Sequence, residues 1–283
     1  MAKIYTASAV KVNDSDIEAI IKKIPSSAAS KEELRLALSL IDLTTLEGKD
    51  TDQRIKDLAQ KAVKTNVAAV CVYPALVAVA KQALKGSNKK VASVAGGFPS
   101  GQIPLNLRLE EAKYAIAEGA DEIDMVISRG KFLEGNYQFV FDEVAAFKEV
   151  CHHVKLKVIL ETGELETLTN IKTASDIAIQ AGADFIKTST GKMSVNATLP
   201  AVCVMLQSIK EHHDSTGKKI GVKPSGGISD GETAVKYLRL TEMIVGKEWL
   251  QPDLFRFGAS RLVDNLLLEI EGKTNVNSTP NGY

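Results

Sequence analysis

The chain has 283 residues, 45% of them hydrophobic and 25% charged, and its 35 basic and 35 acidic residues leave no formal net charge. Balanced charge gives no long-range attraction to nucleic acid or an anionic membrane, and the sequence has neither a signal-peptide pattern nor a membrane-spanning apolar run, so we expect neither partner. The three separated cysteines form no CxxC pair, which indicates reduced thiols in a cytoplasmic protein.

The N-terminal region precedes the first expected strand. Apolar residues at three- and four-residue spacing predict helices over residues 14–24 and 31–40. We expect both helices to cap the closed bottom of the structure. Residues 1–37 are therefore interpreted as an N-terminal helical cap.

Eight short apolar runs, each followed by an amphipathic helical stretch, make up most of the remaining chain. Asp52 and Ser229 are the expected N-caps of two of these helices, and Gly119 and Gly182 the expected glycines after two helix ends. Residues 242–246 compete with the last run for the role of eighth strand. The expected strands cover residues 40–46, 67–73, 90–95, 122–128, 156–162, 184–190, 219–224 and 254–258.

Eight strand–helix units without a break in composition predict an α/β fold, a single (β/α)8 barrel over residues 38–271. The alternative is an open, doubly wound sheet, which usually has fewer strands and a glycine-rich turn after the first. No G-x-G-x-x-G follows the first expected strand, and this favours the closed barrel. The polar tail, residues 272–283, is expected to be flexible.

Alternation along the strands predicts which side chains point into the barrel. On this basis Lys187 and Lys223, on the sixth and seventh expected strands, face the interior. Asp124 on the fourth strand and Asp42 and Thr44 on the first share that orientation. Because sites in such barrels form at the carboxyl ends of the strands, these five side chains are candidates for one site.

Two lysines aimed into one barrel are costly, because burial and mutual repulsion both disfavour the charged amine. A lysine with a depressed pKa is a neutral nucleophile for carbonyl groups, which predicts Schiff-base chemistry at Lys187 or Lys223 with Asp124 beside them. The alternative is structural: a salt bridge of either lysine with Asp124, or of Lys157 with Glu161. The convergence of two lysines and an aspartate favours catalysis.

A second group of residues predicts an anion site. Glycine-containing loops follow the sixth, seventh and eighth expected strands, where phosphate groups recurrently bind in this fold. Three such loops, one of which carries the basic side chain of Lys192, favour a phosphorylated substrate. The candidate phosphate ligands are Gly191, Gly226, Gly227, Ser260 and Arg261.

Other reactive residue types are interpreted as structural. Cys71 faces inward, where it packs in the core or forms a wall of the substrate pocket. The four histidines come as two adjacent pairs on helical segments, which is poor geometry for metal ligands, so we expect surface positions, no metal and no cofactor.

Several motifs, in order over about residues 38–268, resemble the deoxyribose-phosphate aldolase family. The most specific are Phe-Ile-Lys-Thr-Ser-Thr-Gly-Lys at 185–192 and Gly-Val-Lys-Pro-Ser-Gly-Gly at 221–227. The others are the segments 42–46, 70–74, 119–124, 157–165 and 256–260.

The resemblance implies reversible cleavage of 2-deoxy-D-ribose 5-phosphate to acetaldehyde and D-glyceraldehyde 3-phosphate. It implies that Lys187 forms the Schiff base, that Lys223 lowers its pKa and that Asp124 moves protons through water. Thr44 and Thr190 would line the substrate pocket, as would Asp42 and Cys71, with Lys192 near the substrate hydroxyl and phosphate. Gly191, Gly226, Gly227 and Ser260 would bind the phosphate.

Two features of the sequence bear on this resemblance. Members of this family often end in a tyrosine that assists proton transfer, and this chain ends in Tyr283. Many bacterial relatives carry a second serine where Arg261 stands here; arginine could bind phosphate in a bidentate manner or turn to solvent. A different Schiff-base aldolase and a non-catalytic sugar-phosphate-binding barrel remain alternatives, and a homodimer is open because barrels of this kind are often dimers.

Overall fold

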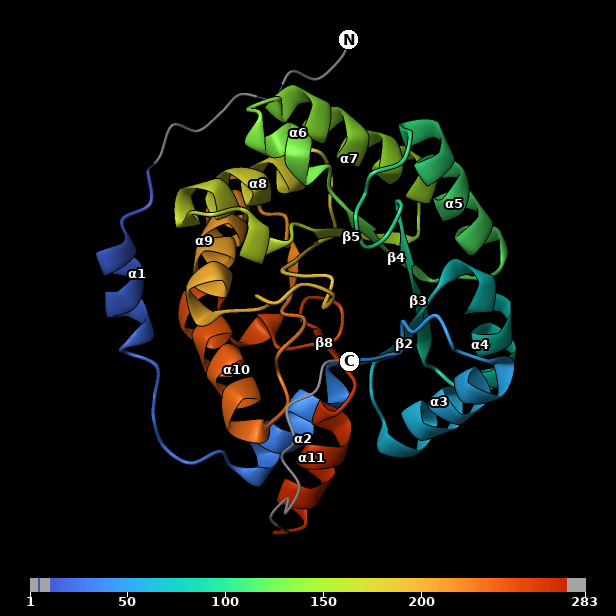
Figure 1. Ribbon diagram of the computed structural model, residues 1–283. Coiled ribbons are helices and arrows are strands. Elements are labelled where there is room, and N and C mark those ends of the chain that lie inside the picture. Colours follow the sequence, from blue (N-terminus) through green and yellow to red (C-terminus); the bar gives the residue numbers. More distant parts are fainter. Residues whose placement is uncertain (1–4, 6–10, 274–283) are drawn as a thin grey trace.

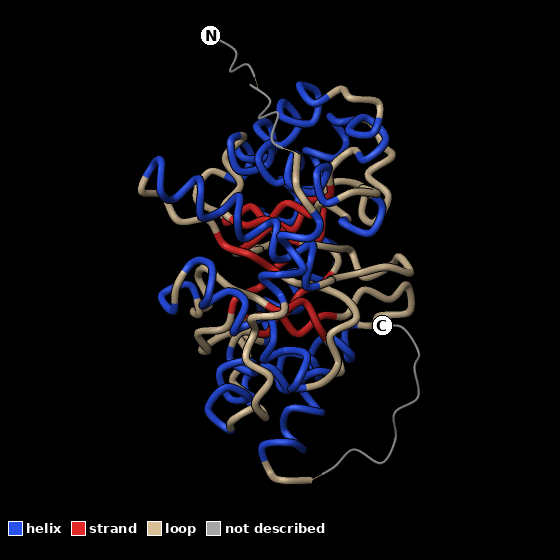
Figure 2. The backbone as a smooth tube through the Cα atoms, turned by 90° about the vertical axis from the view of Figure 1, so that its left-hand side faces the viewer, coloured by secondary structure: helices blue, strands red, loops and turns tan. Residues whose placement is uncertain are grey.

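Eight parallel strands form the centre of the computed structural model, which describes residue 5 and residues 11–273. Figure 1 shows the strands surrounded by helices, and Figure 2 shows them running through the middle of the molecule. The strands are β1 (Ile41–Thr44), β2 (Ala69–Val72), β3 (Lys90–Ala95), β4 (Glu122–Val126), β5 (Lys155–Ile159), β6 (Phe185–Lys187), β7 (Gly221–Lys223) and β8 (Phe257–Ala259).

The strand order is β7-β6-β5-β4-β3-β2-β1-β8, so each strand lies beside its neighbours in sequence and β1 pairs with β8. Parallel bridges between Val222 and Phe255 and between Ser225 and Gly258 bring the two edges of the sheet together. The expected (β/α)8 barrel is confirmed. Its carboxyl-end loops therefore meet around one opening.

Helices cover the outside of the barrel (Figure 1). Apolar residues of strands and helices form one large core between the two layers, whereas the barrel interior holds a small apolar cluster with Leu46, Cys71, Ala92 and Val94. The helices are α1 (Asp14–Ile21), α2 (Lys31–Ser39), α3 (Asp52–Thr65), α4 (Val77–Ala83), α5 (Leu105–Ala117), α6 (Arg129–Leu133), α7 (Tyr137–Cys151), α8 (Leu168–Gln180), α9 (Leu199–Thr216), α10 (Gly231–Val245) and α11 (Leu262–Ile270), with 3-10 turns at Pro74–Leu76, Thr162–Glu164 and Lys247–Trp249.

Two predicted helix starts are wrong by one residue. Thr51, not Asp52, caps α3 by accepting from the backbone of the third helical residue, and Asp230, not Ser229, caps α10. The competing side chains lie next to each other in sequence, and only backbone geometry decides which one becomes the cap. The predicted glycines at helix ends are confirmed: Gly119 and Gly182 follow α5 and α8 with positive φ.

The two predicted N-terminal helices form, but α1 does not lie below the barrel. It packs against α9 on the outer side of the helical ring, at the left edge of Figure 1. Helix α2 packs between α10 and α11 and buries Leu34, Ala37 and Leu38. Most strands are shorter than predicted, and residues 242–246 lie at the end of α10 rather than in a strand. Within the described part of the chain, no helix is long and apolar enough to cross a membrane.

Candidate active site

Strand register places the two predicted lysines side by side inside the barrel. Lys187 at the end of β6 is paired with Lys223 at the end of β7. On the next pair of strands, Asp124 of β4 is paired with Lys157 of β5. Because paired residues of neighbouring parallel strands point to the same side of the sheet, all four side chains enter the interior together.

Asp124 is the centre of the resulting cluster. One of its carboxylate oxygens, Oδ2, accepts hydrogen bonds from Lys187 at 2.9 Å and from Lys223 at 2.7 Å. The other oxygen accepts from Lys157 at 2.8 Å. All four residues are at most 2% exposed, so their charges interact in a medium far less polar than water.

Arg256 and Glu122 complete the cluster, and neither was predicted as a site residue from the sequence. Arg256, just before β8, binds Asp42 and also Glu122 at 2.7 Å, and Lys157 binds Glu122 at 2.6 Å. Lys223 makes its second ion pair with Asp42. The alternative pairing of Lys157 with Glu161 is wrong, because Lys157 points to the three buried acids instead. Alternation on the fifth strand was the one signal available for Lys157.

Charge counting indicates which amine holds its proton least strongly. The cluster contains four basic groups, Lys157, Lys187, Lys223 and Arg256, and three carboxylates. It is neutral only when one basic group is uncharged. Among the described residues, Lys187 forms an ion pair with a single carboxylate, whereas each of the other three basic groups pairs with two or more. Lys187 therefore holds its proton least strongly.

The pKa directions agree with this count. Burial lowers the pKa of Lys187, and the nearby Lys223 ammonium adds to that effect, so that together they outweigh the opposite effect of Asp124. Burial also opposes the charge of Lys223, but Asp124 and Asp42 outweigh it and hold its pKa above the ordinary value. Although burial favours the neutral acid, the three lysines keep the pKa of Asp124 well below its usual range.

Cys71 lies inside the barrel on β2 and is fully buried. Burial raises the pKa of its thiol, and the opposing effect of the lysines nearby does not compensate. A neutral, buried thiol is a weak nucleophile. Cys71 is thus placed as a wall residue of the interior, beside the lysine cluster.

The loop after β6 is held by the buried carboxylate of Glu161. The sequence analysis considered this residue only as a possible salt-bridge partner of Lys157. Glu161, fully buried, accepts hydrogen bonds from the hydroxyl of Thr190 at 2.5 Å and from its backbone N–H at 3.3 Å. Burial raises the pKa of Glu161. The Thr190 hydroxyl in turn accepts from the backbone N–H of Lys192 at 3.1 Å. Glu161 has a left-handed backbone with φ of +55°, which a non-glycine residue adopts only at an energetic cost.

The predicted phosphate residues lie on three neighbouring loops. Gly191, Gly226 and Gly227 all have positive φ. At Gly226 a Cβ atom would lie 2.4 Å from the side-chain oxygen of Asn196, so only glycine fits there. Ser260 and Arg261, just before α11, line a pocket of about 180 Å³ together with residues 43–47 at the end of β1 and in the loop after it, and with side chains of α3 and α11. The three glycines do not line this pocket.

Lys192 reaches across from the loop after β6 to the loop after β1. Its ammonium lies 3.0 Å from the carboxylate of Glu47, and both side chains are about one quarter exposed. Thr44, the predicted pocket residue at the end of β1, donates its hydroxyl to the backbone carbonyl of Asp42 at 2.8 Å and is 7% exposed. Thr44 and Lys192 therefore lie at the carboxyl ends of β1 and β6, the end of the barrel at which Lys187 and Lys223 also lie.

A buried ion pair fixes the loops after β3 and β4. Arg108 of α5 is 1% exposed and lies 2.7 Å from Glu143 of α7. It also donates to the backbone carbonyls of Gly96 and Val126. A planar guanidinium can satisfy several acceptors at once, which explains why arginine occupies this position.

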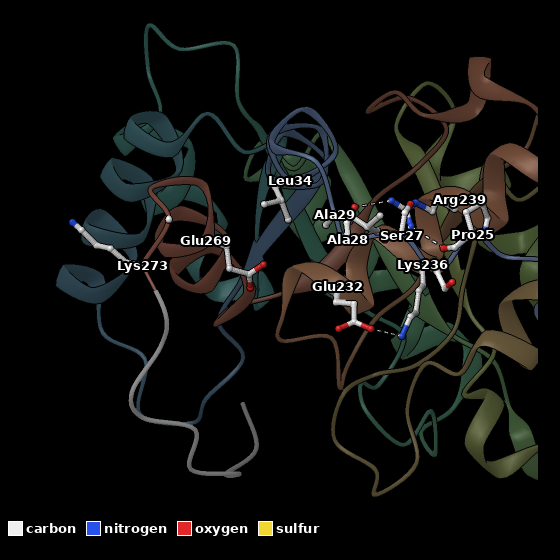
Figure 3. A pocket seen from close by; sticks show the side chains of 13 residues that line it. Pro25, Ser27, Ala28, Ala29, Leu34, Glu232, Lys236, Arg239, Glu269 and Lys273 are labelled. Carbon is white, nitrogen blue, oxygen red and sulfur yellow. Dashed lines mark hydrogen bonds and ion pairs between the residues drawn. The ribbon is translucent and has the colours of Figure 1, made fainter.

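A separate groove of about 640 Å³ lies between residues 25–29 and the helices α10 and α11 (Figure 3). Arg239 closes one side of it by binding Glu33 and the backbone carbonyls of Pro25 and Ser27. None of the predicted site residues line this groove. The groove lies where the N-terminal segment packs against the helices of the barrel.

Tyr283 and the tail from residue 274 onward lie outside the described residues. Within the described ranges, no three His, Cys, Asp or Glu side chains are grouped so that they could bind a metal ion. Of the four histidines, His152 and His153 are exposed, whereas His212 and His213 are half-buried and the ring of His213 contacts Trp249.

Comparison with known proteins places this site in context. Residues 36–245 match the profile of the DeoC/LacD family aldolases. The deoxyribose-phosphate aldolase of Homo sapiens is 44% identical over 93% of this chain and 90% of its own length, and that of Agrobacterium fabrum is 46% identical over 86% and 93%. A crystal structure from Coccidioides immitis superposes with a TM-score of 0.74 at 31% identity, covering 91% of this chain and 98% of that one.

Proposed function

The chain belongs to the DeoC/LacD family of aldolases, and from that premise we propose how its buried lysines cleave a sugar phosphate. The reaction is that of a deoxyribose-phosphate aldolase, the reversible cleavage of 2-deoxy-D-ribose 5-phosphate to acetaldehyde and D-glyceraldehyde 3-phosphate. The observation that carries the mechanism is the unequal environment of two adjacent lysines: the pKa of Lys187 is lowered and that of Lys223 is raised.

Lys187 is the nucleophile. Its neutral amine attacks the C1 carbonyl of the open-chain sugar, and loss of water gives an iminium ion. The iminium nitrogen carries a positive charge. Asp124, whose Oδ2 already lies 2.9 Å from Lys187 Nζ, is placed to stabilise that charge.

The iminium withdraws electrons from the bond between C2 and C3. A base removes the proton of the C3 hydroxyl, the C2–C3 bond breaks, glyceraldehyde 3-phosphate leaves, and the remaining two carbons form an enamine on Lys187. Protonation of the enamine carbon and addition of water release acetaldehyde and the free amine. Asp124 and Lys223, which are hydrogen-bonded to each other at 2.7 Å, supply and receive these protons through water.

The substrate phosphate is assigned to the loops after β6, β7 and β8. Gly191, Gly226 and Gly227 lie there with positive φ, and Ser260 lies just before α11, where the helix dipole favours an anion. Because the N–H of Gly226 donates to the carbonyl of Gly258, we assign the phosphate to the N–H groups of Gly191 and Gly227. Arg261 lines the same pocket as Ser260 and adds a positive charge. This arrangement supports a phosphorylated substrate over a neutral sugar.

Trapping the covalent intermediate tests the mechanism directly. Borohydride reduction in the presence of acetaldehyde should add one two-carbon unit to the chain, located at Lys187 by peptide mass spectrometry. Lys187→Leu should lose both the adduct and the cleavage activity while keeping its circular dichroism spectrum. An intact-mass spectrum of the parent chain without an adduct, or a Lys187→Leu variant that still cleaves the sugar, would refute the assignment.

Three finer proposals accompany this function. Tyr283 assists proton transfer to the enamine carbon, which a variant lacking the last residue tests through exchange of the acetaldehyde methyl protons. The protein works in the cytoplasm, which is supported by the three free, buried cysteines. The active form is a homodimer, which sedimentation tests.

A further inference from the structure

The ion pair between Lys192 and Glu47 crosses the opening of the barrel from the loop after β6 to the loop after β1. The two charged atoms are 3.0 Å apart. An isolated ion pair at a surface often has no defined geometry or role. In this case, both partners are held in place by buried groups beneath them.

Glu47 is anchored by Asp50, whose carboxylate is only 1% exposed. That carboxylate accepts hydrogen bonds from the Thr45 hydroxyl at 2.8 Å and from the backbone N–H of Glu47 at 2.9 Å, and forms an ion pair with Arg54 at 3.0 Å. The loop after β1 is therefore fixed by three contacts to one buried acid. The backbone of Glu47 is thereby held in a defined position.

Lys192 is anchored from the other side. Its backbone N–H donates to Thr190, whose hydroxyl donates to the fully buried Glu161. The strained backbone of Glu161 persists only because surrounding contacts hold it. Two buried carboxylates, Asp50 and Glu161, thus fix the loops that carry the two members of one partly exposed ion pair.

Glu47 also lies beside the proposed phosphate ligands. It lines the pocket of about 180 Å³ that Ser260 and Arg261 line, and it contacts Lys192, the residue directly after the proposed phosphate ligand Gly191. A fixed carboxylate among these residues repels a phosphate dianion and occupies the ammonium that the dianion would use.

We propose that Glu47 is a specificity-determining residue that competes with the substrate phosphate for Lys192, an inference that rests on the function proposed above. In the free enzyme Glu47 neutralises Lys192 and holds it over the opening. When the phosphate arrives, Lys192 exchanges one anionic partner for another. Glu47 thereby weakens the binding of inorganic phosphate and phosphorylated products, and so favours their release.

Titration with inorganic phosphate tests this proposal on the full chain without requiring turnover. Glu47→Gln removes the charge and keeps the shape, so the dissociation constant for phosphate should fall about twofold to fivefold, the effect expected for a partly exposed ion pair. In the synthetic direction, the ratio of the KM values for D-glyceraldehyde 3-phosphate and D-glyceraldehyde should fall by a similar factor. Glu47→Asp, which keeps the charge, should restore phosphate binding toward that of the parent chain.

Glu164→Gln is the matched control, since Glu164 is a half-exposed acid on the neighbouring loop that pairs with Arg129 instead. It should leave the dissociation constant for phosphate unchanged. In a Lys192→Met background, Glu47→Gln should have a clearly smaller effect. Weaker or unchanged phosphate binding in Glu47→Gln, or equal tightening in both glutamine variants, would overturn the proposal. Failure of the proposed function would show instead as absence of the Schiff-base adduct in the parent chain.

Discussion

Replacing Lys223 by methionine should raise the pKa of Lys187 and slow the enzyme most strongly at neutral pH. The two amines lie 2.9 and 2.7 Å from the same oxygen of Asp124, so they are at most about 5.6 Å apart. At that distance, and with an effective dielectric constant of about 20, two unit charges repel by about 3 kcal/mol. This energy corresponds to about 100-fold less neutral amine at a pH below the pKa of Lys187.

The charge count of the cluster also predicts a higher pKa for Lys187 in this variant. Without Lys223, three basic groups face three carboxylates, and the repulsion that Lys223 exerts on the protonated amine of Lys187 is removed. The assay is the rate of borohydride-trapped adduct formation with acetaldehyde, measured for both proteins as a function of pH. The variant's rate should rise with pH toward that of the parent. A variant that is slower by a constant factor at every pH would contradict this reasoning, because it would show that Lys223 acts by other means.

Three further predictions concern the rest of the structure. Lys187→Leu should abolish adduct formation without loss of the fold, as judged by circular dichroism. Arg108→Met should lower the free energy of unfolding by about 3–5 kcal/mol, because it leaves Glu143 as an uncompensated buried charge; urea denaturation measures this, and a loss below about 1 kcal/mol would disprove it. The pKa values of Asp42 and Asp124 are lower in the folded state than in the unfolded chain, so their contribution to stability is complete above about pH 4 and is lost as pH falls toward the folded values. Urea denaturation at several acid pH values should show that loss, and Asp42→Asn should reduce its slope.

Much of the fold was predictable because it depends on local patterns. Two-residue alternation and the strand–helix rhythm identified eight strands, and the orientation of Lys187, Lys223 and Asp124 toward the interior followed from alternation alone. Strand ends were less predictable, since β6 covers only Phe185–Lys187 where a seven-residue strand was expected. The polar chain after Lys187 leaves the sheet to form a loop, and nothing in its β-forming composition indicates that departure.

The contacts that tune the site were not readable from the sequence. Arg256 binds Asp42 and Glu122, which are 214 and 134 residues away in the chain. Glu161 holds Thr190 from a backbone conformation that its residue type does not favour. Such pairs depend on the register between strands and on how the barrel closes, and a single sequence specifies neither directly.

The sequence by itself determined the barrel, the face on which each strand residue lies, and the presence of two lysines and an aspartate in one interior. These properties follow from the periodicity of the backbone, which acts over a few residues. Only the tertiary structure decided which lysine has the lowered pKa. That choice depends on how many carboxylates surround each amine, and those carboxylates come from strands β1 and β4, far away in the chain. Closure of the barrel brings them together, and the low polarity of the buried interior makes the difference in their number large.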